Sequence, residues 1–290
     1  MTLTVIDKVP SSMTDTNKIQ KNKPTFAIQH FPGDSYDTPD NTPRFLMDRM
    51  FLGSRWFFVA GYLGFILRFR FPALKNNYDT AAWSESSYGT FRLTERCGGR
   101  FHLRGLDNMR SCEEPVVFIS NHMSTLETFV LPCIIAPFMD VTFVVKESLV
   151  SHPLFGPIMR SRNPVVVKRV NPREDFRVVM EKGREFLAKG VSIVVFPQST
   201  RTEIFNTEEF NTLGVKLAKS AGVKVIPIAL KTDFWGNGKY LKEVGPINRD
   251  KPIHMVFGKP IEITGSGKEE HRQIVEFIKT NLREWGVTII

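Results

Sequence analysis

The segment Val116-Val-Phe-Ile-Ser-Asn-His-Met-Ser-Thr-Leu-Glu127 joins a short apolar run to a histidine and a carboxylate. Its first part, Val116–Ile119, has the length and β-branched content of a strand that is buried on both faces. A helical pattern follows over residues 126–136. This succession of a buried strand and a helix indicates an α/β fold and sets the pattern for the rest of the chain.

The same alternation continues toward the C-terminus. Further apolar runs predict strands at Val141–Val145, Val165–Val167, Ser192–Phe196, Val223–Ile228 and Ile253–Phe257. Helical patterns lie near 173–189, bounded by Pro172 and Gly190, near 208–220, and over 267–284. Strands that alternate with helices predict an α/β fold with a largely parallel central sheet flanked by helices.

Two regions precede this main domain, which we expect to span residues 98–290. Residues 1–42 are polar and show little apolar periodicity, so we expect a flexible tail there. Residues 43–97 are much richer in apolar side chains than the tail, and they carry two helical segments, 44–71 and 79–97.

The segment 44–71 is the expected contact with a membrane. Its uncharged run Trp56–Leu67 has 12 residues, which make a helix of about 18 Å, whereas the apolar core of a bilayer is about 30 Å thick. Arginines at both ends are long enough to reach lipid phosphates. We therefore expect residues 43–97 to dock on a membrane surface rather than span it. A helix that is buried against the main domain is the alternative.

Composition limits the classes of partner. The chain of 290 residues has 39 Lys and Arg against 30 Asp and Glu, and the net charge of +9 favours a phospholipid surface, a phosphorylated substrate or a nucleic acid. Basic residues are spread rather than interleaved with aromatic ones, so we expect no nucleic acid partner. Three cysteines indicate a reducing, cytoplasm-facing location. Neither metal-ligand spacing nor a nucleotide fingerprint occurs, so we expect no metal and no cofactor.

His122 and Glu127 form a candidate catalytic pair. Five steps along a regular helix would separate their side chains by about 140°, so they can meet only if His122 lies in the turn after the strand and Glu127 in the first helical turn. The carboxylate then accepts the Nδ1 proton and leaves Nε2 free as a general base. Taken alone, the two residues also suit a structural or surface pair.

Three blocks occur in a fixed order, Asn121-His122-x4-Glu127, Phe196-Pro-Gln-Ser-Thr-Arg201 and Val225-Ile-Pro-Ile228. This ordered set resembles the PlsC-type glycerolipid acyltransferase family, which has an NH-x4-D block, an FPEGTR block and a VIP-type strand. Lys146-Glu-Ser-Leu149 and Arg169 resemble the family's intervening blocks. The resemblance covers roughly residues 98 to 265.

The resemblance implies a reaction and its partners. A fatty acyl group would pass from acyl-CoA or acyl-carrier protein to the free hydroxyl of 1-acylglycerol 3-phosphate in phospholipid biosynthesis. His122 would be the general base and Glu127 its partner, without an acyl-enzyme intermediate. Backbone N–H groups at the start of the following helix are the expected donors to the oxyanion. A membrane-associated enzyme at the cytoplasmic face is the expected setting.

The acceptor's phosphate calls for fixed cations. Arg201 and Arg169 each follow a predicted strand, so we expect both to open into the crevice at the carboxyl end of the sheet, with Lys146 as a further cation. Gln198 and Thr200 belong to the same block as Arg201 and are expected to help shape the acceptor site.

Three residues depart from the family pattern. Glu127 stands where aspartate is usual and keeps the carboxylate, whereas Gln198 replaces a glutamate and Ser199 a glycine. Because the block with Gln198 and Ser199 helps to shape the acceptor site, these two substitutions leave the identity of the acceptor undecided. The alternative acceptors are glycerol 3-phosphate, a lyso-aminolipid or another lysophospholipid. A lipid-surface binding protein without turnover and a metal-dependent hydrolase that uses His122 are the further alternatives.

Overall fold

The computed structural model describes residues 28–198 and 200–290, so residues 1–27 of the predicted tail, and Ser199, lie outside the described residues. Within that part, eight strands form one sheet in the order β1-β2-β8-β7-β3-β6-β4-β5. They are β1 (Tyr36–Asp37), β2 (Phe101–Arg104), β3 (Val117–Ser120), β4 (Val141–Lys146), β5 (Val165–Val167), β6 (Ser192–Val195), β7 (Val225–Lys231) and β8 (Ile253–Phe257).

The strands from β7 through β3, β6 and β4 to β5 run parallel to their neighbours. β8 is parallel to β2 but antiparallel to β7, and β1 is antiparallel to β2. The predicted α/β fold with a largely parallel sheet is therefore confirmed. β1 has no counterpart among the predicted strands.

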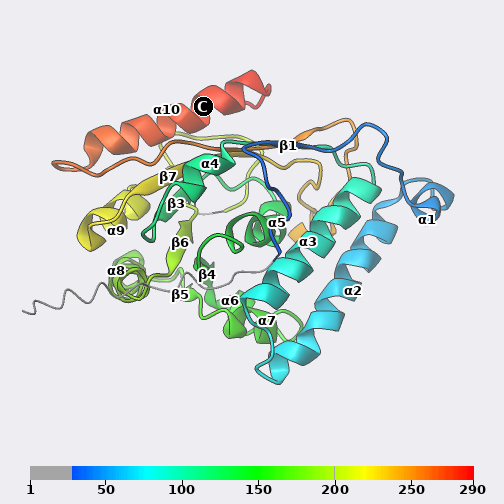
Figure 1. Ribbon diagram of the computed structural model, residues 1–290, viewed down its shortest axis with the longest axis horizontal. Coiled ribbons are helices and arrows are strands. Elements are labelled where there is room, and N and C mark those ends of the chain that lie inside the picture. The colour runs from blue at the N-terminus through cyan, green and yellow to red at the C-terminus, as the bar shows by residue number, and fades with distance from the viewer. Residues whose placement is uncertain (1–27, 199) are drawn as a thin grey trace, which may run out of the picture.

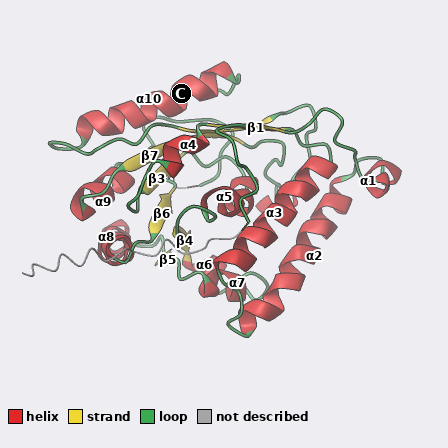
Figure 2. Ribbon diagram, in the orientation of Figure 1, coloured by secondary structure: helices red, strands yellow, loops and turns green. Residues whose placement is uncertain are grey.

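Helices cover both faces of the sheet (Figures 1 and 2). They are α1 (Leu46–Met50), α2 (Arg55–Leu74), α3 (Thr80–Arg96), α4 (Leu106–Arg110), α5 (Leu126–Ile135), α6 (Glu147–Val150), α7 (Gly156–Ser161), α8 (Pro172–Ala188), α9 (Leu213–Ala221) and α10 (Lys268–Glu284), with a 3-10 turn η1 (Lys242–Val244). Side chains of β3 alternate between two cores. Phe118 packs with α2, α3 and α5, whereas Val117 and Ile119 pack with α8, α9 and α10.

Local signals explain where the helices begin. The Asn171 side chain accepts hydrogen bonds from the backbone at the start of α8, as Asp79 does for α3. α9 starts later than the predicted 208–220 because the preceding chain is engaged elsewhere. The backbone N–H groups of Phe205 and Thr207 donate to carbonyls of the C-terminal residues 288 and 290. That pairing holds the segment extended and delays the helix.

The prediction of a flexible tail over residues 1–42 is wrong for residues 28–42. Phe31 is buried, and β1 adds an edge strand to the sheet. The hydroxyls of Tyr36 and Thr38 both donate to the buried carboxylate of Glu95 on α3. Isolated apolar side chains in polar sequence give no periodicity, which is why this packing was not predicted.

The segments 44–71 and 79–97 are helical, as predicted, and α3 packs between α2 and α5 (Figure 1). α2 continues past Arg68 and Arg70, and its 20 residues are long and apolar enough to cross a membrane by length and composition. One face of α2 is buried in the protein, through Phe58, Tyr62, Ile66 and Phe69. The opposite face exposes large apolar side chains, namely Trp56, Leu67, Phe71 and Leu74.

Candidate active site

The carboxyl ends of the parallel strands bring the predicted residues to one edge of the sheet. β3 is paired on both sides, with Ile119 opposite Val195 of β6 and Pro227 of β7. His122 follows β3, and the block Phe196–Arg201 follows β6. Lys146 ends β4, and Arg169 follows β5, the strand next to it. Crevices at this edge are the usual ligand sites of parallel sheets.

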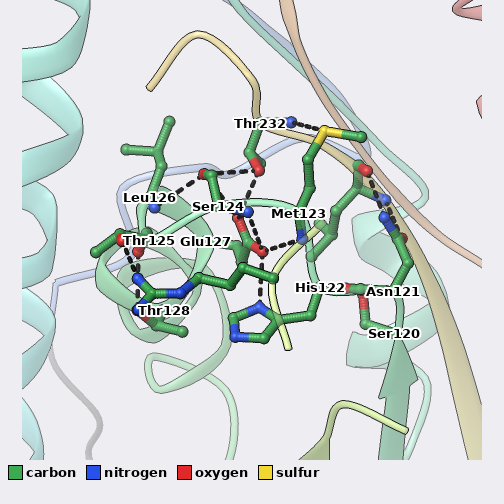
Figure 3. Close-up of polar contacts among 12 residues, drawn as sticks. Ser120, Asn121, His122, Met123, Ser124, Thr125, Leu126, Glu127, Thr128 and Thr232 are labelled. Carbon is green, nitrogen blue, oxygen red and sulfur yellow. Dashed lines mark hydrogen bonds and ion pairs between the residues drawn. The ribbon is translucent and has the colours of Figure 1, made fainter. Parts of the chain in front are cut away.

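His122 lies in the turn after β3 and Glu127 at the start of α5, so the two side chains meet as predicted (Figure 3). Glu127 lies in the first turn of α5, and its Oε1 is 2.9 Å from Nδ1 of His122. Because the carboxylate accepts the proton on Nδ1, the neutral imidazole keeps its lone pair on Nε2. The His122 side chain is 14% exposed, whereas that of Glu127 is fully buried. The pair thus presents a basic nitrogen while its acid is shielded from water.

Four further donors converge on the Glu127 carboxylate. The backbone N–H groups of Met123 and Ser124 lie 2.7 and 2.9 Å from Oε1, and the hydroxyls of Ser124 and Thr232 donate to Oε2. Burial raises the pKa of Glu127, but the hydrogen bonds from His122 and Thr232 and the charge of His122 outweigh it and bring the pKa below its ordinary value. Glu127 is therefore ionised at neutral pH.

The segment that follows β6 contacts both the backbone and the imidazole ring of His122. The Gln198 Oε1 accepts the backbone N–H of His122 at 2.8 Å, and the N–H of Thr202 donates to the His122 carbonyl at 3.0 Å. The imidazole stacks on Phe196 with ring centroids 4.3 Å apart. Gln198 is buried and does not line the cavity described below. The structure therefore shows that Gln198 helps to position His122, and its expected part in shaping the acceptor site stays a prediction.

Asn121 fixes the turn to the neighbouring strand. Its side-chain amide donates to the carbonyl of Leu230 at 2.7 Å and accepts the Leu230 N–H at 2.9 Å. Both bonds are buried, so the side chain replaces the backbone partner that β7 loses where β3 ends. Thr232 follows two residues later. No pattern in the sequence predicted the role of Thr232, which lies more than 100 residues from Glu127.

Four of the N–H groups at the start of α5 are already engaged. The N–H of His122 binds Gln198, those of Met123 and Ser124 bind Glu127, and that of residue 126 binds the Ser124 hydroxyl. The prediction that N–H groups at the start of the helix stabilise an oxyanion is wrong for these four groups. A buried, ionised carboxylate is stable only when hydrogen-bond donors surround it, so the N–H groups that bind Glu127 are not free to bind an oxyanion.

A cavity of about 590 Å³ opens in front of His122. One part is lined by polar and charged side chains, namely Thr125, Lys146, Arg169, Thr200, Arg201, Lys242 and Glu243. The rest of the lining comes mainly from α2, α3, β4 and α7 and is mostly apolar, with Phe65, Ile66, Phe69, Trp83, Phe143, Val145, Phe155, Ile158 and Met159, although Tyr78, Ser86, Ser87, Thr90 and Arg162 also line it. Its shape and chemistry suit a ligand with an anionic head and a hydrocarbon chain.

The cationic part is organised around Arg201. Its guanidinium donates to the Thr125 hydroxyl and pairs with Glu243 at 2.7 Å. Lys242 donates to the Thr200 hydroxyl at 2.6 Å. Lys242 and Glu243 belong to η1, and sequence reasoning missed both because a charge pair in a polar loop looks like any solvated surface.

Arg169 lies close enough to Arg201 for their charges to interact. Burial lowers the pKa of Arg169, and the positive charge of Arg201 lowers it further. The backbone of Arg169 is left-handed, with φ of 58°, and the Asp175 carboxylate accepts its N–H at 2.8 Å. Lys146 is exposed at the end of β4 and lines the same cavity. The structure thus brings together His122, Glu127 and all three predicted cations.

Metal ligands are not gathered in the part of the chain that the structure describes. Within it, no group of three His, Cys, Asp or Glu side chains is arranged to hold a metal ion.

Replacing Glu127 with glutamine is expected to cost about 3 kcal/mol of folding free energy at neutral pH, because the buried donors around the carboxylate lose a charged acceptor. The folded pKa of Glu127 lies below its ordinary value of 4.5. The ionised carboxylate therefore stabilises the fold above that value, and the benefit disappears as the pH falls below it. Urea unfolding of both proteins between pH 7 and pH 3 should show a difference that shrinks with acidification.

The exposed Glu262 offers a matched control, and Glu262→Gln should change the unfolding free energy by less than about 0.5 kcal/mol across this range. A Glu127→Gln difference that is constant with pH would contradict an ionised, stabilising carboxylate.

Comparisons with known proteins agree with this geometry. Residues 100–231 match the acyltransferase family. Over 216 residues the chain is 32% identical to a 1-acyl-sn-glycerol-3-phosphate acyltransferase of Pseudomonas aeruginosa. The matched region covers 74% of this chain and 76% of the relative. It is 29% identical over 164 residues to the chloroplastic 1-acyl-sn-glycerol-3-phosphate acyltransferase LPAT1 of Arabidopsis thaliana, covering 56% of this chain and 44% of that one.

The fold is similar to a solved structure. The crystal structure of the 1-acyl-sn-glycerophosphate (LPA) acyltransferase PlsC from Thermotoga maritima superposes with a TM-score of 0.60 at 19% identity, over 82% of this chain and 96% of that one. The sheet with its helical layers is thus shared. Together with the identity to the Pseudomonas relative, this shows that the chain is an acyltransferase and belongs to the PlsC-type glycerolipid acyltransferase family.

Proposed function

We propose that this protein transfers a fatty acyl group from a thioester, acyl-CoA or acyl-carrier protein, to the free hydroxyl of 1-acylglycerol 3-phosphate. The observation that carries the proposal is the His122–Glu127 pair, whose imidazole lines one cavity together with cationic and apolar side chains. The names of the relatives in Pseudomonas and Arabidopsis support the same acceptor.

The reaction needs two proton transfers, and one imidazole can carry out both. As the acceptor hydroxyl attacks the thioester carbonyl, Nε2 of His122 takes its proton and the C–O bond forms. The tetrahedral intermediate then collapses, the C–S bond breaks, and the imidazolium returns the proton to the leaving thiolate. Glu127 stabilises the imidazolium through the 2.9 Å contact with Nδ1. General-base catalysis of this kind is worth roughly 10²–10⁴-fold.

The two parts of the cavity account for the two ends of the acceptor. Arg201, Arg169 and Lys146 supply positive charge for its phosphate, and Arg201 offers the forked donors that phosphate prefers. Thr200 lines the same part of the cavity. The apolar walls receive hydrocarbon chains, whose burial contributes about 0.8 kcal/mol for each methylene.

We propose further that residues 43–97 dock the enzyme on the cytoplasmic face of a membrane without spanning it. The outer face of α2 and the neighbouring α1 segment expose apolar side chains, namely Leu46, Met47, Met50, Phe51, Leu52, Trp56, Leu67, Phe71 and Leu74. Arg49 and Arg55 lie among them in the sequence and suit anionic headgroups. The inner face of α2 is buried against the domain, which favours a helix lying on the lipid over one surrounded by it.

The first test is the release of free thiol from a purified enzyme and an acyl thioester. Release should require 1-acylglycerol 3-phosphate, and His122→Ala should lower kcat at least about 100-fold while the fold survives. His102→Ala is the matched control, because His102 forms a comparable pair with Asp37 outside the cavity. Release without acceptor would indicate a hydrolase, and release with His122→Ala at the wild-type rate would remove the pair from the mechanism.

The second test concerns the phosphate. Arg201→Gln should raise the KM for 1-acylglycerol 3-phosphate about tenfold or more and change kcat little, because a charge-assisted contact is lost in binding. Arg104→Gln serves as control, since Arg104 pairs with Asp37 away from the cavity. An unchanged KM, or a better rate with glycerol 3-phosphate or a lyso-aminolipid than with 1-acylglycerol 3-phosphate, would contradict the proposed acceptor.

The third test is flotation with vesicles that contain phosphatidylglycerol. The double variant Leu67→Glu, Phe71→Glu places two charges on the outer face of α2 and should reduce the bound fraction several-fold. Phe176→Glu on α8 also charges an exposed apolar side chain, but on the opposite layer of the fold, and should bind as the wild type does. Equal flotation of the double variant would argue against docking through α2.

A further inference from the structure

One buried polar group in the cavity wall has no role in the reaction described so far. Tyr62, on the inner face of α2, lines the cavity and is 1% exposed. Its hydroxyl has no hydrogen-bond partner among residues 28–198 and 200–290. Buried hydroxyls are normally paired, because an unpaired one has lost water without gaining a partner. The missing partner is therefore expected to come from a ligand.

The ring of Tyr62 is held in place by its aromatic neighbours. Trp235 and Phe129 meet it edge to face, each with ring centroids 4.9 Å apart, and Phe155 lies at 6.2 Å. These contacts fix the direction of the hydroxyl before any ligand binds. A hydrogen bond from it would thus require little ordering of the side chain.

Glu243 and Arg201, which line the same cavity as Tyr62, act electrostatically on its hydroxyl. Burial raises the pKa of Tyr62, the charge of Glu243 raises it further, and that of Arg201 lowers it. The phenol therefore stays protonated and can donate. A phosphate that pairs with Arg201 would arrive beside a neutral O–H donor.

We propose that the Tyr62 hydroxyl donates a hydrogen bond to a phosphate oxygen of the acceptor, which makes α2 a part of the acceptor-binding site. This inference rests on the proposed function and names one further contact to the same substrate. The orphaned hydroxyl, its fixed ring and the cavity that Tyr62 lines together with Arg201 support it.

Tyr78 provides a matched control in the same cavity wall. It is also buried and lines the cavity, but its hydroxyl already forms a hydrogen bond with Ser86. Removing the hydroxyl should therefore have opposite effects at the two positions. Tyr62→Phe removes an unpaired group from the free protein, whereas Tyr78→Phe breaks an existing bond.

The experiment compares the two variants in the full chain. Tyr62→Phe should raise the KM for 1-acylglycerol 3-phosphate about tenfold, leave kcat and the KM for the thioester within about twofold, and keep or raise the melting temperature. Tyr78→Phe should lower the melting temperature and leave both KM values unchanged. Titration with 1-acylglycerol 3-phosphate, followed by tryptophan fluorescence, gives a Kd that should rise with the KM for Tyr62→Phe.

Three results would overturn the inference. These are an unchanged KM and Kd for the acceptor in Tyr62→Phe, a rise in the KM of the thioester instead, or a lower melting temperature with both KM values unchanged. A wild-type enzyme without acceptor-dependent thiol release would contradict the proposed function itself. An active wild type that Tyr62→Phe matches in every constant would contradict only the contact proposed here.

Discussion

A single buried negative charge organises this active site. The Glu127 carboxylate has no access to water, so its ionised form depends on the donors that surround it. Two of these donors are backbone N–H groups of the turn after β3, and a third is the Thr232 hydroxyl after β7. The turn therefore has to wrap around the carboxylate, and His122, as part of that turn, is held with Nδ1 against it. The shape of the chain and the tautomer of the base follow from the same contacts.

The parallel sheet supplies the rest by placing strand ends beside one another. Asn121 joins the end of β3 to β7, and the segment after β6 holds His122 through Gln198 and Phe196. Neighbouring strands bring Arg169 and Lys146 to the same edge. The N-terminal helices then close the apolar part of the cavity. The site is thus a joint product of the sheet, which orders the polar groups, and of α2 and α3, which exclude water from the hydrocarbon part.

Much of this arrangement could be predicted because its signals are local. Short β-branched runs marked the buried strands, Pro172 and Gly190 marked the ends of one helix, and a five-residue spacing placed His122 and Glu127 in a turn and a helix start. The prediction failed where a contact joins distant segments. Thr232 and Glu243 approach the site across gaps of about 100 and 40 residues, and no pattern near them shows it. The oxyanion prediction failed for a related reason, since the demand of a buried carboxylate for N–H donors depends on its depth.

The two faces of α2 have a consequence for how the enzyme senses its substrate. The outer face is apolar and open, and the inner face forms a wall of the cavity. If the outer face rests on a bilayer as proposed, a lipid acceptor need never pass through bulk water to reach His122. Turnover would then follow the mole fraction of the acceptor within the leaflet instead of its amount per litre. Adding inert phospholipid at constant total acceptor would slow the enzyme by dilution in two dimensions.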